Sequence, residues 1–125
     1  MVISGTTLNQ VLGAAMHAAA FRDQIHNHNL ANNDTPKFKK YEVSFEQSLR
    51  QAVDNFKKTG NMDLSRAVPV AHRVHTTLST RVDGNNVDIN EENVQILRNS
   101  VMYDMLVNSY TANKQLHRTV FDGIR

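Results

Sequence analysis

Apolar positions recur every three or four residues over the first thirty residues, which is the period of one face of an α-helix. This pattern predicts a helix over residues 6–31. The apolar stripe is narrow and rich in alanine, so a partner helix could approach it closely, and Arg22 interrupts it. Its members are Leu8, Val11, Leu12, Ala15, Ala18, Ala19 and Ile25.

The last third of the chain predicts a second long helix, over residues 90–121. Asp88 and Glu91 have the spacing of a capping box at its start. At about 1.5 Å per residue this helix spans on the order of 45 Å, and the first spans nearly as much. One near-heptad line of side chains follows it, and further apolar residues widen that side. The line comprises Val94, Leu97, Val101, Met105, Asn108, Ala112 and Gln115, widened by Met102, Leu106, Tyr110, Leu116 and Val120.

Between the two long helices the pattern predicts a loop, a short helix and an irregular middle. The loop covers residues 32–43, because Pro36 disfavours a helical Thr35 and asparagines close helices well. Ser44 and Gln47 have capping-box spacing before a helix over residues 45–58, which Gly60 ends. Residues 61–88 form a flexible middle, in which "AVPVAHRVH" and "LSTRV" either pair as short strands or stay mobile. A turn cluster covers residues 83–86.

The composition agrees with one mainly α-helical domain over residues 1–125. The chain is 40% hydrophobic and 21% charged, while aromatic residues make up only 6%, so the core is expected to be thin. We expect the two long amphipathic helices to pack as a coiled-coil-like pair beside the shorter third helix and the irregular or short-stranded middle.

The charge pattern gives little indication of a nucleic-acid partner. The formal net charge is +2, and the densest basic cluster, Lys37, Lys39 and Lys40, is followed at once by Glu42 and Glu46. The chain has no cysteine, which excludes disulfides and thiolate metal sites. The N-terminus lacks the features of a secretory signal, and no window approaches the roughly 20 apolar residues of a membrane span.

The six histidines raise the possibility of a metal site, which their spacing does not favour. His26 and His28 would point about 200° apart on a helix, and no third ligand stands at a fixed spacing, although Asp23 could join His26 across one turn. The stretch "DGNNVDINEE" lacks the glycine that a calcium loop needs at its sixth position. No nucleophile elbow, phosphate loop or dinucleotide fingerprint occurs. We therefore expect no enzyme, cofactor, metal or small-molecule substrate.

The loop and its surroundings carry a more specific signal. Residues 29–39 resemble the signature "N-[IL]-A-N-x-x-T-P-G-[FY]-K" of the bacterial flagellar rod and hook family. The matching residues are Asn29, Leu30, Ala31, Asn32, Thr35, Pro36, Phe38 and Lys39. "FKKYEVSFEQSL" and "GNNVDINEE" are also similar to that family, so the resemblance covers nearly the whole chain. Lys37 stands where the family usually has glycine, and a positive φ there would cost about 1 kcal/mol or more. Either the turn is of a type that lysine accepts or the local geometry differs.

This resemblance implies a structural subunit of the flagellar basal body, outside the cytoplasmic membrane. Its terminal helices would pack together and, with neighbouring subunits, form the inner wall of a rod that transmits torque. The implied partners are other rod subunits, the MS ring and its adaptor, and the flagellar type III apparatus that would export the chain unfolded. Folding would then be coupled to assembly, and the loop would act as a stiff corner whose asparagines and Lys39 serve capping and subunit contacts.

Two long helices with narrow stripes can bury one face against each other and still leave apolar side chains for neighbouring subunits. The stripe residues of both helices are therefore predicted to form the helix pair and the subunit interface. The competing hypothesis is a soluble helical adaptor or export chaperone that binds a partner helix, since it would share these features.

Overall fold

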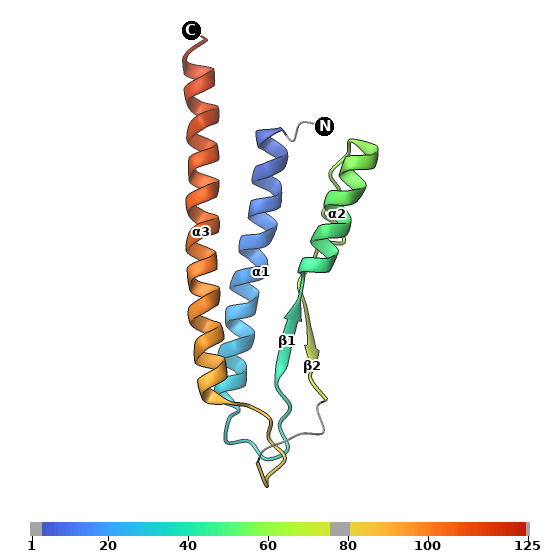
Figure 1. The fold of residues 1–125 in the computed structure, drawn as a ribbon, viewed down its shortest axis with the longest axis vertical. Coiled ribbons are helices and arrows are strands. Elements are labelled where there is room, and N and C mark those ends of the chain that lie inside the picture. Colours follow the sequence, from blue (N-terminus) through green and yellow to red (C-terminus); the bar gives the residue numbers. More distant parts are fainter. Residues whose placement is uncertain (1–3, 76–80, 125) are drawn as a thin grey trace.

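In a computed structural model of the chain, the structure describes residues 4–75 and 81–124. The elements in chain order are α1 (Gly5–Ala31), β1 (Tyr41–Ser44), α2 (Glu46–Thr59), β2 (Val70–Arg73) and α3 (Ile89–Asp122). Figure 1 shows α1 and α3 side by side, with the two strands and α2 along the other side of α1. The predicted mainly α fold, with paired terminal helices, a shorter third helix and a short-stranded middle, is confirmed.

The ends of the long helices follow from local capping chemistry. Ser4 Oγ accepts a hydrogen bond from the Thr7 backbone N–H at 3.2 Å, and Asp88 Oδ1 accepts from the N–H groups of Asn90 and Glu91 at 2.8 and 3.2 Å. These bonds satisfy donors that the first helical turn leaves unpaired. The Asp88 half of the predicted capping box is confirmed, whereas the Glu91 carboxylate accepts from Lys40 Nζ.

The predicted C-terminal end of α2 is confirmed, and its predicted N-terminal cap is wrong. Gly60 ends the helix in the left-handed conformation, with φ 74°, as predicted. The predicted capping box at Ser44 and Gln47 is wrong, because Ser44 belongs to β1 and the cap position falls on Phe45. No side chain caps this end of α2; the N–H of Phe45 donates instead to Glu46 Oε2 at 3.3 Å.

The two strands form one antiparallel sheet in which Tyr41 lies opposite Arg73 and Ser44 opposite Val70. The stretch "AVPVAHRVH" supplies β2, whereas β1 lies in residues that the sequence pattern assigned mainly to the loop. Most of "LSTRV" falls on residues 76–80, outside the described ranges. The flexibility of residues 61–88 stays a prediction.

The apolar core is small and lies between α1 and a second layer, which consists of the two-stranded sheet, α2 and the loop after α2. Ala18, Phe45, Ala52 and Ala67 form its buried cluster, against which Ala14, Ala15, Leu49 and Leu64 pack. The alanines of α1 therefore serve the contact with α2 and the loop after it, because small side chains let Phe45 approach the helix. The structure thus places Ala15 on the second-layer side of α1.

None of the helices in the described part of the chain is both long and apolar enough to cross a membrane.

The second layer explains why Arg22 interrupts the apolar stripe of α1. The Arg22 guanidinium lies 2.5 Å from Glu46 Oε1 and donates to the Val43 carbonyl at 3.5 Å. Arg22 therefore ties α1 to the start of α2 and to β1.

Candidate functional site

The signature loop and the segment before α3 meet at one end of the molecule, in a junction that we call the corner (residues 29–41 and 83–92). Figure 1 shows this junction at the end where the helix pair and the sheet come together. Asn85 is fully buried there, with 0% of its surface exposed. Its side-chain Nδ2 lies 2.9 Å from the carbonyl oxygens of Asn32 and Asn33 and 2.8 Å from that of Thr35, and its Oδ1 accepts from Val87 N–H at 2.8 Å. One amide thus holds the loop against the segment that enters α3.

Asn86 extends these hydrogen bonds to the ends of the two strands. The Lys40 N–H donates to Asn86 Oδ1 at 2.7 Å, and Asn86 Nδ2 donates to the Val74 carbonyl at 3.1 Å. The Asn86 amide therefore bridges the end of the two-stranded ladder as a peptide group would. The Lys39 ammonium donates to the Gly84 carbonyl at 2.6 Å, so this residue of the signature is engaged inside the chain.

Lys37 has a left-handed backbone conformation, at the position where the signature has glycine. Its φ is 61°, and its backbone N–H donates to the Asp83 carbonyl at 2.9 Å. Neither alternative raised by the sequence applies, since the turn keeps a positive φ and lysine occupies it under strain. The hydrogen bond to Asp83 and the contacts of the corner hold the turn in place.

The remaining signature residues shape the turn. Asn32 Nδ2 donates to the His28 carbonyl at 2.9 Å, and the Thr35 hydroxyl lies 3.2 Å from Asn32 Oδ1. The ring of Phe38 meets that of His28 edge to face, with centroids 5.7 Å apart. Ala31 ends α1, and both it and Pro36 are exposed.

Asn29 joins α1, β1 and α3 at one buried point. Its exposed fraction is 0%, and its amide forms a two-way pair with the backbone of Tyr41: Nδ2 donates to the carbonyl at 2.8 Å and Oδ1 accepts from the N–H at 2.9 Å. Nδ2 also lies 3.3 Å from Glu92 Oε2. Asn29 therefore gives the outer edge of β1 a substitute strand partner and ties it to α3.

A buried pair of His26 and Glu92 completes the corner. His26 Nδ1 lies 2.6 Å from Glu92 Oε2, and Glu92 is 2% exposed. Sequence spacing had suggested Asp23 as the partner of His26; Asp23 instead accepts from Asn27 Nδ2 at 3.1 Å. A buried carboxylate without its partner would be costly, so this pair favours one register of α3 on α1.

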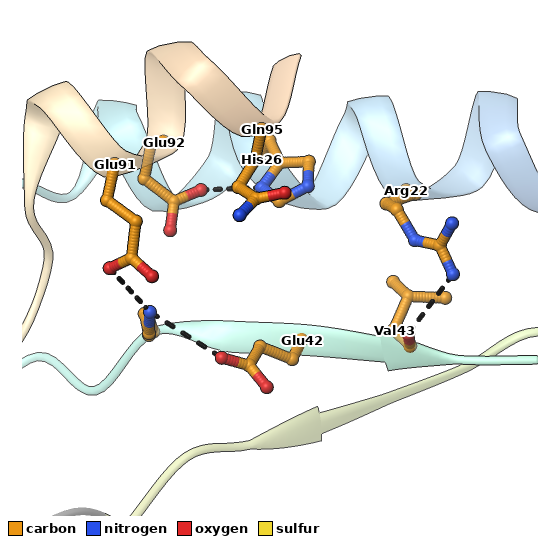
Figure 2. Close-up of a pocket in the computed structure, with 8 residues that line it drawn as sticks. Arg22, His26, Glu42, Val43, Glu91, Glu92 and Gln95 are labelled. Carbon is orange, nitrogen blue, oxygen red and sulfur yellow. Dashed lines mark hydrogen bonds and ion pairs between the residues drawn. The ribbon is translucent and has the colours of Figure 1, made fainter. Parts of the chain in front are cut away.

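Figure 2 shows these groups around a hollow of about 270 Å³ between the helix pair and β1. The Lys40 ammonium lies 3.0 Å from Glu91 and 3.5 Å from Glu42. Burial alone would lower the pKa of Lys40, but the hydrogen bond and charge of Glu91, with the charges of Glu42 and Glu92, raise that pKa above its usual value. The charges around the hollow are engaged with one another, which suits fixing a geometry.

Beyond the corner, a polar seam joins α1 and α3. Asn99 Nδ2 donates to the Ala19 carbonyl at 2.8 Å, and Asn113 Nδ2 lies 2.9 Å from both the Gly5 carbonyl and Asn9 Oδ1. Glu92, Asn99 and Asn113 are separated by multiples of seven residues, so they return to one face of α3. We call this face the seam.

The most apolar line of α3 lies away from the seam. We call it the row: Val94, Leu97, Val101, Met105, Ala112 and Leu116. Leu97 is 66% exposed and Met105 65%, and all six residues of the row are exposed. Nine residues make two and a half turns, so Val101 faces about 180° away from Glu92. The row therefore takes no part in the seam, and its place in a subunit interface stays a prediction.

The stripe residues predicted on α1 divide between the two sides of that helix. Ala19 is buried beside the seam, where its carbonyl accepts from Asn99. Val11, Leu12 and Ile25 are half-buried, and Leu8 is 39% exposed. The helix pair is thus held by polar ties together with these partly covered apolar side chains.

Comparison with known proteins decides the family. No family model matches the chain. The flagellar basal body rod protein FlgB of Borreliella burgdorferi is 33% identical over 103 residues, which cover 71% of this chain and 76% of that protein. The chain belongs to the FlgB family of flagellar basal body rod proteins.

Two further FlgB proteins extend the match. That of Salmonella typhimurium is 31% identical over 106 residues, covering 73% of this chain and 75% of the relative. That of Bacillus subtilis is 27% identical over an alignment that covers 98% of this chain and 97% of the relative. Membership of the FlgB family supports a structural role in the basal body rod and fits a place in the flagellar basal body.

Sequence reasoning missed the residues that do most at the corner. The sequence places Asn85 and Asn86 in a turn cluster and in a stretch similar to the family, and it gives Glu92 no role of its own. The signal that could have found them was the joint occurrence of the two signature stretches. Two polar motifs in one small domain, each rich in asparagine, can satisfy each other's backbone groups once buried.

Proposed function

We propose that the chain is a structural subunit of the flagellar basal body rod, outside the cytoplasmic membrane, and that it assembles through the exposed face of α3. The row carries this proposal. A soluble helix normally covers its apolar residues against its own core. The side of α3 that meets α1 combines the polar seam with half-buried residues such as Ile96 and Leu106, whereas the apolar row is left exposed. An exposed apolar line of this kind would be buried and stabilised by contact with other subunits.

The free energy available to such a contact is substantial. Covering the half-exposed part of each large side chain in the row would contribute about 1 kcal/mol, so five of them supply several kcal/mol. The core inside a single chain is small, and ordering its backbone costs about 1–2 kcal/mol per residue. Contacts between subunits therefore add to the stability of a single chain, which couples the ordering of the helix ends to assembly.

The corner suits a part that transmits torque. Asn29, Asn85 and the pair of His26 and Glu92 join the helix pair to the second layer through buried hydrogen bonds. Buried, satisfied polar networks resist changes of angle because each displaced group would lose its partner. Torque applied to one layer would thus pass to the other with little bending.

The partners that follow from this role are other rod subunits, together with the MS ring and its adaptor at the base of the rod. The flagellar type III apparatus would export the chain unfolded before assembly. The absence of cysteine and the small core favour this route, because neither a disulfide nor a large preformed core opposes an extended chain.

Charge placed on the row tests the proposal. The double substitution Leu97→Glu and Val101→Glu adds two carboxylates to exposed positions, so the monomer should keep its circular dichroism and melting temperature. Rod completion, seen by electron microscopy of isolated basal bodies, and swimming should both be lost. The matched control is Thr111→Glu, at another exposed position on α3. Complete rods and normal swimming with the charged row would contradict a rod function, and would favour a soluble adaptor.

A further inference from the structure

A second surface lies beside the seam, on a different side of α3 from the row. It is a groove of about 390 Å³ between α1 and α3. Three of its lining residues are small, Ala19 and Ala20 on α1 and Ser100 on α3, and the others are Asp23, Gln24, Asn99 and Tyr103. Short side chains on both walls let a third helix approach closely, as small residues do at tightly packed helix contacts.

The floor of the groove contains an unsatisfied polar group. Only 5% of the surface of Asn99 is exposed, and its Nδ2 donates to the Ala19 carbonyl. Its Oδ1 is buried and has no hydrogen-bond partner within residues 4–75 and 81–124. A buried acceptor without a donor is costly, so this part of the α1–α3 contact is not fully satisfied within one chain.

Charges of opposite sign flank the two surfaces. Arg98 stands beside the row and is exposed, and it forms no ion pair within the described part of the chain. Asp23 lies in the groove, and over the same residue ranges it too has no ion pair. Each surface therefore carries a charge that the other could satisfy.

The register of the seam brings these charges to similar heights. His26 is level with Glu92 and Ala19 with Asn99, so Asp23 is level with about residue 95 or 96. Arg98 is then about 4 Å further along the axis, less than one helical turn. Two parallel copies side by side, with little axial offset, would place Arg98 of one copy near Asp23 of the next.

We infer that the groove of one copy receives the row of a second copy, with Arg98 of the second copy paired to Asp23 of the first. This inference rests on the proposed rod function and identifies the contact between neighbouring subunits. The row and the groove lie on different sides of one molecule, so the contact is heterologous. Every copy then offers a free row to one neighbour and a free groove to another, and repetition builds a continuous wall.

Because the chain has no cysteine, engineered thiols report this contact directly. In cells whose only copy is A20C/L97C, a short bis-maleimide applied to isolated basal bodies should link neighbours into dimers and higher multimers. Their yield should exceed that of A20C alone, L97C alone and Q47C/L97C by at least tenfold. Gln47 is an exposed position on α2 and serves as the matched control. If A20C/L97C impairs swimming, Q24C/V94C probes the same contact near the corner.

A charge exchange tests the orientation of the two copies. R98E and D23R should each lower the yield of linked multimers about tenfold, and R98E/D23R should restore it, because the pair is re-formed with its signs exchanged. Dimers from L97C alone would mean that two rows meet each other, and that result would overturn the inference. So would a yield equal to that of Q47C/L97C while the chain is present in the rod. A chain absent from basal bodies of swimming cells would instead remove the proposed function itself.

Discussion

Replacing Asn85 by aspartate changes one side-chain NH₂ into an oxygen at the most polar point of the corner. In the native chain Nδ2 lies 2.8–2.9 Å from three carbonyl oxygens, so N85D would place a carboxylate oxygen against them. Each of these carbonyls keeps a second donor: the Thr35 N–H for Asn32, Arg81 for Asn33 and the Phe38 N–H for Thr35. The loss therefore comes mainly from holding a buried carboxylate against carbonyl oxygens, and we expect N85D to lower the free energy of unfolding by about 4 kcal/mol at neutral pH.

The pH dependence of N85D gives a sharper signature. Burial and the facing carbonyls would raise the pKa of the introduced carboxyl above its unfolded value of about 3.9. The loss of stability is then complete above the folded pKa and shrinks as the pH falls, because the protonated carboxyl can donate to one carbonyl. N85A, which cannot titrate, should be less stable than the native chain by about 2–3 kcal/mol with no such added pH dependence.

Urea unfolding followed by circular dichroism measures these differences. The control is N61D, which makes the same chemical change at an exposed residue after α2 and should stay within about 0.5 kcal/mol of the native chain. If N85D proves as stable as N61D, or if its stability does not recover on acidification, the account of the corner is refuted.

Three further outcomes follow from other contacts. K37G should raise the free energy of unfolding by about 1 kcal/mol by relieving the positive φ, and an unchanged or lower urea midpoint would argue against strain there. H26L should lower it by about 3 kcal/mol because the buried Glu92 loses the closer of its two partners and keeps only Asn29 Nδ2 at 3.3 Å, and H26L/E92M should regain most of that loss; a double variant as weak as H26L would contradict this. The raised pKa of Lys40 makes its contribution complete below about pH 10.5 and lost at higher pH, so K40M should remove an alkaline fall in melting temperature that the native chain shows; an identical fall in both would count against the contacts with Glu91 and Glu42.

The helices could be predicted from the sequence because their signals are local. A period of 3.6 residues, the cap at Asp88 and the glycine at Gly60 each act within one or two turns. The strand β1 gave no such signal. Its residues, "YEVS", become a strand by pairing with Val70–Arg73 and by the amide of Asn29, contacts with residues distant along the chain.

The partner of each helical face could not be predicted from periodicity. The near-heptad line on α3 was identified as a line, but its spacing does not say which surface covers it. The seam uses Glu92, Asn99 and Asn113, which are residue types that are mostly exposed in proteins. Only the position of α1 shows that it supplies their hydrogen-bond partners. Likewise the burial of Asn85 depends on the fold of two segments about fifty residues apart.

A cryo-electron-microscopy map of basal bodies from the bacterium that carries this chain tests the central claim most directly. We expect the chain to lie in the rod wall, with α1 and α3 paired and the row of α3 covered by a neighbouring subunit. A rod that lacks the chain, or one in which the row faces water along its whole length, would contradict it.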